Sequence, residues 1–252
     1  MEHAGKHALV TGGGTGIGEG IAVALAEAGA EVTITGRRAD KLEAVAATHP
    51  RLHALVMDVD DEASVRDGIA AAAASRGPIR ICVANAGIAE GGPFETTTLA
   101  DWRRTMTTNL DGVFLTFQAA MATLAPDTPA RMIVVSSIAG VRGLKNAIPY
   151  TVTKHGVIGL IRGLSEEFMR RPITFNALCP GYVDTAIVQN QIPGLMRRFD
   201  VDKQGAIDVI AKGNRHRRLL EVDETTAAAM WLCSDGARSV NGQTIQISGG
   251  QV

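Results

Sequence analysis

The sequence has few cysteines, few aromatic residues and almost no net charge. Its three cysteines, Cys82, Cys179 and Cys233, lie far apart without a CxxC pair. They therefore predict buried, reduced thiols rather than a disulfide framework or a metal site. A net charge of −1 gives no support to binding of nucleic acid or of a membrane surface. No apolar run reaches the roughly 20 residues that span a bilayer. A strand-like run follows Lys6 directly and leaves no room for a signal peptide, so we expect a cytoplasmic protein.

Short apolar runs alternate with longer helical patterns along the 252 residues. Near-continuous apolar strands separated by helices indicate a parallel sheet covered on both faces. Right-handed crossovers then give a doubly wound, Rossmann-like α/β fold. No linker or repeat divides the chain, so we expect a single domain over residues 1–252 with about seven strands. The expected strands are His7–Thr11, Glu31–Thr35, Leu52–Met57, Ile79–Ala84, Arg131–Ser136, Ile173–Leu178 and Thr244–Ile247. The expected helices are Gly16–Ala28, Ala39–Ala47, Glu62–Ser75, Leu99–Leu124, Tyr150–Arg170 and Val222–Cys233.

One segment, residues 186–218, interrupts this alternation. It has little strand signal and two weak helical patterns, and it follows a strand end, where ligands bind in such sheets. A long segment at that place predicts a helical lid over the substrate. Its excess of positive charge suits a phosphate-bearing handle such as coenzyme A, but it equally suits solvated helix faces with salt bridges. The basic residues of this lid are Arg197, Arg198, Lys203, Lys212, Arg215, Arg217 and Arg218, against Asp200, Asp202 and Asp208.

Glycines cluster immediately after the first expected strand. Residues 7–21 read HALVTGGGTGIGEGI, in which Gly12, Gly16 and Gly18 carry the pattern TGxxxGxG. Glycine permits a tight turn and lets bare backbone approach a pyrophosphate at a helix N-terminus, where unpaired N–H groups favour anions. Three glycines at this spacing after a first strand predict a dinucleotide-binding turn.

Ser137, Tyr150 and Lys154 form the candidate catalytic group. Ser137 lies at a strand end, and Tyr150 and Lys154 lie four residues apart, on one face of a helix. A phenol with a pKa of about 10 is a poor acid or base at neutral pH unless a cation stabilises the phenolate, and Lys154 supplies that cation. Ser137 can donate a hydrogen bond to the substrate oxygen. A YxxxK pair alone is an ordinary surface feature, but with the glycine turn it predicts an oxidoreductase that interconverts a secondary alcohol and a ketone.

With these residues, the sequence resembles the short-chain dehydrogenase/reductase family over essentially its whole length. Six motifs match in order: TGGGTGIG at 11–18, VANAG at 83–87, NLDGVF at 109–114, VVSSIAG at 134–140, YTVTK at 150–154 and CPGYVDT at 179–185. The resemblance implies that Tyr150 is the general acid/base and that Ser137 polarises the carbonyl. It further implies that Lys154 binds the nicotinamide ribose and lowers the pKa of Tyr150, and that Asn109 anchors a proton-relay water.

The resemblance also implies the cofactor contacts and the assembly. Asp58 is expected near the adenine, Asn85 beside the central sheet, and Val183 and Thr185 at the nicotinamide amide. A homotetramer or dimer would be built on the two longest expected helices. The full set of expected cofactor contacts is Gly12, Gly14, Thr15, Gly16, Ile17, Gly18, Arg37, Arg38, Asp58, Val59, Asn85, Ala86, Gly87, Tyr150, Lys154, Pro180, Gly181, Val183 and Thr185.

The loop after the second strand bears on the choice of nicotinamide cofactor. An acidic residue there would accept the ribose hydroxyls and repel a 2′-phosphate, but Gly36 is followed by Arg37 and Arg38. A guanidinium pairs well with phosphate, so NADP(H) is favoured over NAD(H). Two alternatives stay open, a solvated basic loop and an arginine stacked on the adenine of NAD. Thr15 provides no second cation in the glycine turn.

Within the family the motifs are most similar to 3-hydroxybutyrate and 3-hydroxyacyl-thioester dehydrogenases and to 3-oxoacyl reductases. Ala89, Ala139 and Ala147 stand where a small-acid enzyme would place polar pocket side chains, which favours a bulkier 3-oxo or 3-hydroxy substrate such as a CoA thioester. Gln191 and Arg142 are weaker candidates for substrate contacts. The alternatives are a dehydrogenase of a simple secondary alcohol or 3-hydroxy acid and, in another class, a non-catalytic nucleotide-binding regulator. Such a regulator would be expected to lack a member of the catalytic group.

Overall fold

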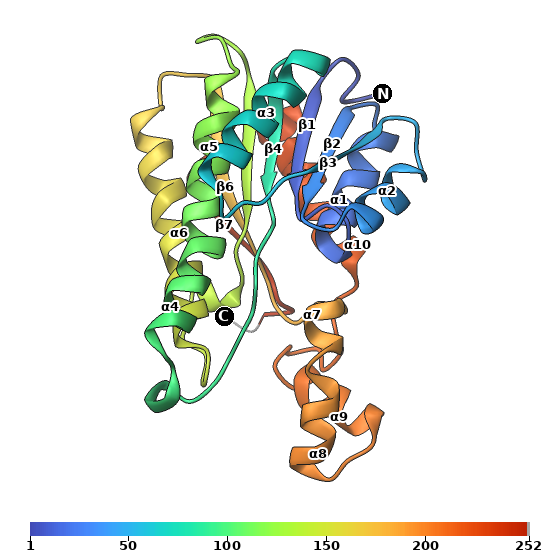
Figure 1. The fold of residues 1–252 in the computed structure, drawn as a ribbon, viewed down its shortest axis with the longest axis vertical. Helices are drawn as coiled ribbons and strands as arrows, with labels where there is room; N and C mark the ends of the chain where they lie inside the picture. The colour runs from blue at the N-terminus through green and yellow to red at the C-terminus, as the bar shows by residue number, and fades with distance from the viewer. Residues whose placement is uncertain (251–252) are drawn as a thin grey trace.

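The computed structural model describes residues 1–250. Seven strands form one parallel sheet in the order β3-β2-β1-β4-β5-β6-β7. Helices cover both of its faces (Figure 1), so the predicted doubly wound, Rossmann-like fold is confirmed. The strands are β1 His7–Thr11, β2 Glu31–Gly36, β3 Leu52–Val56, β4 Ile79–Ala84, β5 Ala130–Val135, β6 Ile173–Pro180 and β7 Thr244–Ile247.

Burial explains why the strands are readable in the sequence. Every residue of β1, β5 and β6 is buried, as expected of central strands covered by helices on both faces. The sheet order reverses at β1, whose neighbours are β2 and β4. In such sheets a ligand binds beyond the carboxyl ends of the strands at this switch point.

The helices differ from the prediction mainly at their ends. The helix expected over Leu99–Leu124 is interrupted by a π turn at Thr107–Asp111. The helix expected over Tyr150–Arg170 begins earlier, at Ile148, because Pro149 fits its first turn. The main helices are α1 Gly16–Glu27, α2 Ala39–Ala46, α3 Glu62–Arg76, α4 Leu99–Met106, α5 Gly112–Ala122, α6 Ile148–Glu167 and α10 Val222–Cys233, with a short 3₁₀ turn, η3, at Ile138–Gly140.

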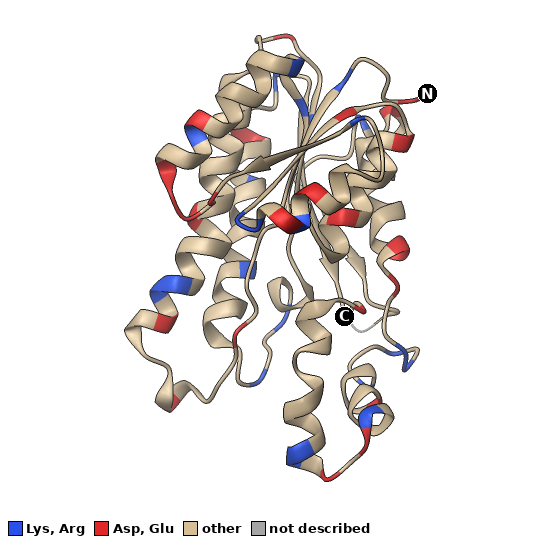
Figure 2. Cartoon of the chain, turned by 45° about the vertical axis from the view of Figure 1, so that its right-hand side comes forward, with Lys and Arg blue, Asp and Glu red and all other residues tan. Residues whose placement is uncertain are grey.

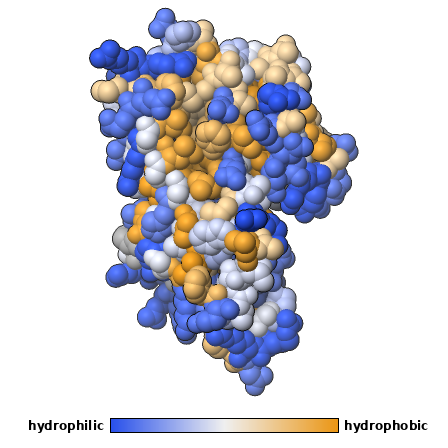
Figure 3. All heavy atoms as spheres, turned by 60° about the vertical axis from the view of Figure 1, so that its left-hand side comes forward, coloured by the Kyte–Doolittle hydropathy of each residue, from blue (hydrophilic) through white to orange (hydrophobic). Residues whose placement is uncertain are grey.

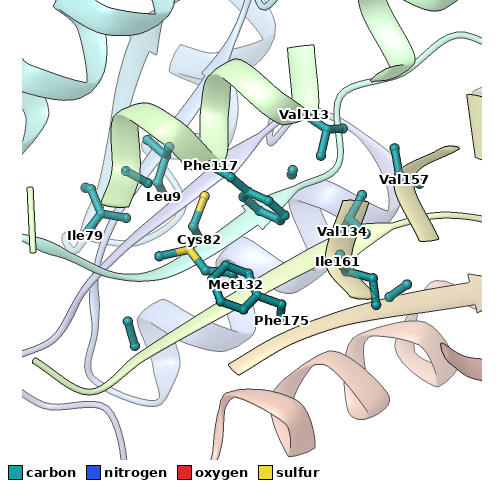
Figure 4. Close-up of a cluster of buried hydrophobic side chains, with 14 of the residues drawn as sticks. Leu9, Ile79, Cys82, Val113, Phe117, Met132, Val134, Val157, Ile161 and Phe175 are labelled. Carbon is teal, nitrogen blue, oxygen red and sulfur yellow. The ribbon is translucent and has the colours of Figure 1, made fainter. Parts of the chain in front are cut away.

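A hydrophobic core lies on each face of the sheet. On one face α3, α5 and α6 pack against the strands, and Phe117 meets Phe175 edge to face with ring centroids 6.4 Å apart (Figure 4). On the other face α1, α2 and α10 pack. The three cysteines are buried and free, as expected. No helix within residues 1–250 is long and apolar enough to cross a membrane.

The lid, residues 186–218, is helical as expected and projects from the carboxyl edge of the sheet (Figure 1). Its small hydrophobic cluster, which includes Val188, Ile192 and Ile210, is separate from both cores of the sheet. The lid contains α7 Ala186–Gln189, α8 Ile192–Phe199 and α9 Lys203–Ala211.

Candidate active site

The glycine turn borders a cavity of about 410 Å³ at the carboxyl ends of β1 to β4. Gly12 and Gly16 adopt φ angles of +66° and +60°, which side chains other than glycine rarely adopt. A Cβ added at Gly16 would lie 3.2 Å from Cγ2 of Thr185, and one at Gly12 would lie 2.9 Å from the Asn85 amide. The turn therefore brings bare backbone to the cavity at the N-terminus of α1, where anions are favoured.

Asn85 joins the ends of β4 and β1 behind this turn. Its Nδ2 donates to the carbonyls of Thr11 at 3.0 Å and Gly12 at 3.2 Å, and its main-chain N–H donates to the Thr11 hydroxyl at 3.0 Å. A Cβ at Gly18 would lie 2.4 Å from both the Asn85 amide and the Gly12 carbonyl. Gly18 is buried and does not line the cavity. This glycine permits close packing of α1 on the turn, and its expected contact with the cofactor stays a prediction.

Ser137, Tyr150 and Lys154 line a second, larger cavity of about 980 Å³. Ser137 follows β5, and its Oγ accepts a hydrogen bond from the Ala139 N–H at 3.1 Å. Burial raises the pKa of Tyr150, and a hydrogen bond with Ser137 partly offsets that effect. The two hydroxyl groups are thus brought together at one wall of the cavity.

Lys154 lies one helical turn after Tyr150. Its Nζ is 5.5 Å from the centroid of the Tyr150 ring and donates to the Val135 carbonyl at 2.8 Å. Only 6 % of the lysine is exposed, and burial lowers its pKa to about 8. Burial, rather than Lys154, has the largest influence on the pKa of Tyr150, so the expected lowering by Lys154 stays a prediction.

Asn109 lies in the π turn behind the cavity and is 1 % exposed. Its side chain pairs with the backbone of Ile88 in both directions, each at 2.8 Å, and also donates to the Thr153 hydroxyl at 3.3 Å. A Cβ at Gly87 would lie 3.1 Å from Oδ1 of Asn109 and 3.8 Å from Nζ of Lys154. Asn109 therefore lies close to Lys154, with its amide engaged by the protein.

Nearly all other predicted contacts reach one of the two cavities. Gln191 and Arg142 line the larger one, as do Ala89 and Ala147, whereas Ala139 is fully buried and does not. Ala139 lies inside η3, and its expected place beside the substrate stays a prediction. The expected cofactor contacts that line a cavity are Gly12, Gly14, Thr15, Gly16, Ile17, Arg37, Arg38, Asp58, Val59, Asn85, Ala86, Gly87, Tyr150, Lys154, Pro180, Gly181, Val183 and Thr185.

Sequence reasoning missed five polar residues of the smaller cavity, which are Thr35, Lys41, Asp60, Thr108 and Asn190. Lys41 lies in the first turn of α2, beside the two arginines. The Thr108 hydroxyl donates to Oδ2 of Asp60 at 3.1 Å, while Oδ1 of Asp60 is buried without a hydrogen-bond partner among the described residues. Since buried acceptors are normally paired, this oxygen fits a donor group on a ligand. The position of Lys41, three residues after Arg38, is the sequence signal that could have identified it as a third basic residue of this cavity.

Asn214 ties the lid to the sheet. The residue is 0 % exposed, and its side chain bonds both main-chain groups of Tyr182 at 3.0 Å and the Arg218 carbonyl at 2.8 Å. A Cβ at Gly181 would lie 2.4 Å from its Oδ1. The outgoing and returning segments of the lid are thereby joined at the edge of the larger cavity.

The two cavities adjoin, because Ile17, Asn85, Gly87 and Thr185 line both. A glycine cradle, an unpaired buried acceptor and basic residues fit the adenosine and phosphate portions of a dinucleotide in the smaller cavity. The hydroxyl and ammonium groups lie in the larger one. The fold and these adjoining cavities define the class, a dinucleotide-binding α/β protein with buried hydroxyl and ammonium groups beside the binding site.

The chain belongs to the short chain dehydrogenase family, whose model matches residues 6–195. It is therefore an NAD(P)-binding oxidoreductase that acts on CH–OH groups. It is 33% identical over 250 residues to gluconate 5-dehydrogenase of Gluconobacter oxydans (strain 621H), covering 98% of this chain and 94% of that protein. Identity to acetoacetyl-CoA reductase of Rhizobium meliloti (strain 1021) is 34% over 244 residues, covering 97% of each.

A solved structure of an actinorhodin polyketide ketoreductase variant with NADPH is similar over almost its whole length. The TM-score is 0.92 at 28% sequence identity, covering 98% of this chain and 97% of that one. The Rossmann-like fold thus agrees with that of a family member.

Proposed function

We propose that the protein interconverts a ketone and a secondary alcohol with Tyr150 as the acid/base. The observation that carries this proposal is the convergence of Ser137, Tyr150 and Lys154 on one cavity beside the glycine turn. When bound, the nicotinamide supplies or accepts the hydride at the carbinol carbon. The Tyr150 hydroxyl gives its proton to the carbonyl oxygen during reduction and recovers it during oxidation. Ser137 donates a hydrogen bond to the same oxygen.

Lys154 and Asn109 support this proton transfer. The Lys154 ammonium, 5.5 Å from the Tyr150 ring centroid, stabilises negative charge on the phenol oxygen and would hold the nicotinamide ribose. Since its side-chain amide is engaged by Ile88, Asn109 would hold a relay water through its main-chain carbonyl. Together the four residues provide a path for the proton from solvent to Tyr150.

The cofactor in this proposal is NADP(H) rather than NAD(H). Arg37, Arg38 and Lys41 line the smaller cavity after β2, and the ion pairs found in residues 1–250 involve none of them. Three unneutralised cations suit the 2′-phosphate of NADP(H), because guanidinium and ammonium groups bind phosphate oxygens strongly. The related ketoreductase with NADPH supports the same choice.

The substrate in this proposal is a 3-oxoacyl or 3-hydroxyacyl thioester, or a similarly bulky compound. The cavity beside Tyr150 is about 980 Å³, including the part lined by expected nicotinamide contacts. The small side chains of Ala89 and Ala147 in its lining leave room for a substrate larger than a small acid. Relatives that carry the names acetoacetyl-CoA reductase and polyketide ketoreductase support this substrate class.

The assembly in this proposal is a homotetramer built on α4, α5 and α6. Leu99, Phe114 and Val152 on these helices are 63%, 47% and 40% exposed. Figure 3 shows the molecule from this side, where hydrophobic side chains gather between polar margins. Light scattering of the purified protein tests this assembly, and a monomeric mass would contradict it.

A rate comparison tests the proposed reaction. Simple ketones, 3-oxo acids and 3-oxoacyl thioesters are each offered with NADPH and with NADH. We expect the highest kcat/KM for a thioester with NADPH. If the protein reduced none of these ketones with either cofactor, the proposed reaction would be contradicted.

A further inference from the structure

Besides Lys154, the larger cavity carries three basic side chains on two separate elements. Arg142 and Lys145 belong to the loop between η3 and α6, and Arg198 belongs to α8 of the lid. Glu90, an acidic residue of the same lining, is paired with Arg104. The ion pairs within the described part of the chain include none of the three cations. The cavity therefore presents unneutralised positive charge on both sides.

Arg142 has an unmet hydrogen-bonding group. Its Nε is buried and has no hydrogen-bond partner within residues 1–250. A buried N–H donor without an acceptor is costly, and a planar guanidinium fits two oxygens of one anion. An anionic group bound beside Arg142 would supply the missing acceptor.

The loop that carries Arg142 and Lys145 is held in place by the backbone. The Gly92 N–H donates to the Asn146 carbonyl at 2.8 Å, and the Arg142 N–H donates to the Ile138 carbonyl at 3.0 Å. A Cβ at Gly91 would lie 2.7 Å from the Asn146 carbonyl, so this close approach requires glycine. The backbone that carries the two cations is thus held in place before a ligand arrives, which reduces the entropy lost on binding.

The charge of the lid does not act as one patch. Among its seven basic residues Arg198 lines the larger cavity and Arg197 does not, and Arg218 is paired with Glu224 at 2.6 Å. The basic positions of the lid lie apart, at the tip of α8 and near the returning segment (Figure 2). Arg198 is therefore the lid cation that can act together with Arg142 and Lys145.

We propose that Arg142, Lys145 and Arg198 form a subsite for an anionic group of the substrate that lies away from the reacting carbonyl. This inference rests on the proposed function, since it names a substrate class for the same cavity. The anion is a phosphate of a thioester carrier or the carboxylate of a free acid. Both offer oxygens to the guanidinium groups, and the test below distinguishes them.

Binding without turnover tests the subsite. Calorimetry compares 4′-phosphopantetheine with pantetheine, and acetoacetate with methyl acetoacetate, so that each pair differs by one anionic group. The variants are Arg142→Gln and Arg198→Gln. Arg197→Gln is the matched control, because it removes a neighbouring charge that does not line the cavity. Arg142→Lys keeps the charge and checks that any loss follows from charge rather than from misfolding.

We expect the charged member of one pair to bind on the order of tenfold more tightly than its neutral partner. Arg142→Gln and Arg198→Gln should abolish this preference, Arg197→Gln should keep it, and Arg142→Lys should restore part of it. Tighter binding of 4′-phosphopantetheine than of pantetheine identifies the anion of the subsite as a phosphate. Tighter binding of acetoacetate than of methyl acetoacetate identifies it as a carboxylate. Equal binding within both pairs, or equal losses in Arg197→Gln and Arg198→Gln, would overturn the subsite. Because no turnover is required, anion preference without ketone reduction would contradict only the proposed function.

Discussion

The nucleotide side of the sheet and the lid are stabilised in different ways. The nucleotide side is anchored in two extensive cores, and Asn85 joins the ends of β1 and β4 beneath the glycine turn. The lid has a separate small cluster and is attached through Asn214, the Val183–Leu220 bridge and the Arg218–Glu224 ion pair. Regions with few buried contacts open at lower free energy than core strands. We infer that the chemistry is fixed on the rigid part and that substrate selection is shared between the loop after η3 and the softer lid.

The largest expected effect on turnover comes from a substitution in the rigid part. Tyr150→Phe removes the proposed proton donor, so we expect turnover to fall by about 10²–10⁴-fold. Cofactor affinity, measured by fluorescence titration, should change little. His155→Gln is the control, because this exposed histidine lies on the same helix and its ring bonds the Thr151 carbonyl. A near-normal rate in Tyr150→Phe would show that another group transfers the proton.

A smaller effect is expected at the cofactor phosphate. Arg37→Ala should raise the KM for NADPH by roughly 10- to 100-fold, since hydrogen bonds to charged groups contribute about 1.5–3 kcal/mol. The KM for NADH should change much less. Arg66→Ala is the control, because Arg66 is exposed on α3 and pairs with Asp67. An equal rise in KM for both cofactors would show that Arg37 stacks on the adenine or binds the cofactor without regard to the 2′-phosphate.

The substitution Asn214→Ala tests whether the lid can loosen separately from the sheet. The substitution removes the Asn214 partners of the Tyr182 N–H and the Arg218 carbonyl, and each unmet group costs about 1–3 kcal/mol. The Tyr182 carbonyl still accepts from the Leu220 N–H at 2.8 Å. We expect faster hydrogen exchange over residues 186–218 and a KM for the ketone raised about tenfold, with little change in exchange of β1 or β4. Gln204→Ala, at an exposed position on α9 bonded to Asp208, is the control. Faster exchange throughout the sheet would contradict the separation of the two regions.

The smallest effect, a change in rate with pH, should not depend on the lid. Because burial lowers the pKa of Lys154 to about 8, its ammonium is lost as the pH rises through that value. Ketone reduction needs this cation beside Tyr150, so kcat/KM for reduction should fall above about pH 8. Asn214→Ala should keep the same midpoint. A profile that stays flat to pH 10 would contradict the proposed role of Lys154.

The same division explains what could be predicted from the sequence. The strands and the glycine turn could be predicted because local sequence determines them. Apolar runs indicate the strands, and glycines stand at positions where a side chain would collide. The π turn could not be predicted in this way, because it depends on contacts with residues distant in the sequence. Thr108 bonds Asp60, and a Cβ at Gly112 would lie 3.0 Å from Val59. The lid cations were counted correctly, but their directions follow from tertiary packing. A count of charge could not single out Arg198.

The junction at Asn214 also determines where the chain tolerates insertion. By joining the returning segment to Tyr182, it closes residues 183–214 into a loop at its base. The entropy of closing a loop grows only with the logarithm of its length. Added residues at the exposed turn around Asp200, which already has a φ of +51°, would therefore cost little free energy and leave the strands in register. Evolution or protein engineering can thus enlarge the lid at its tip without rebuilding the site beneath it.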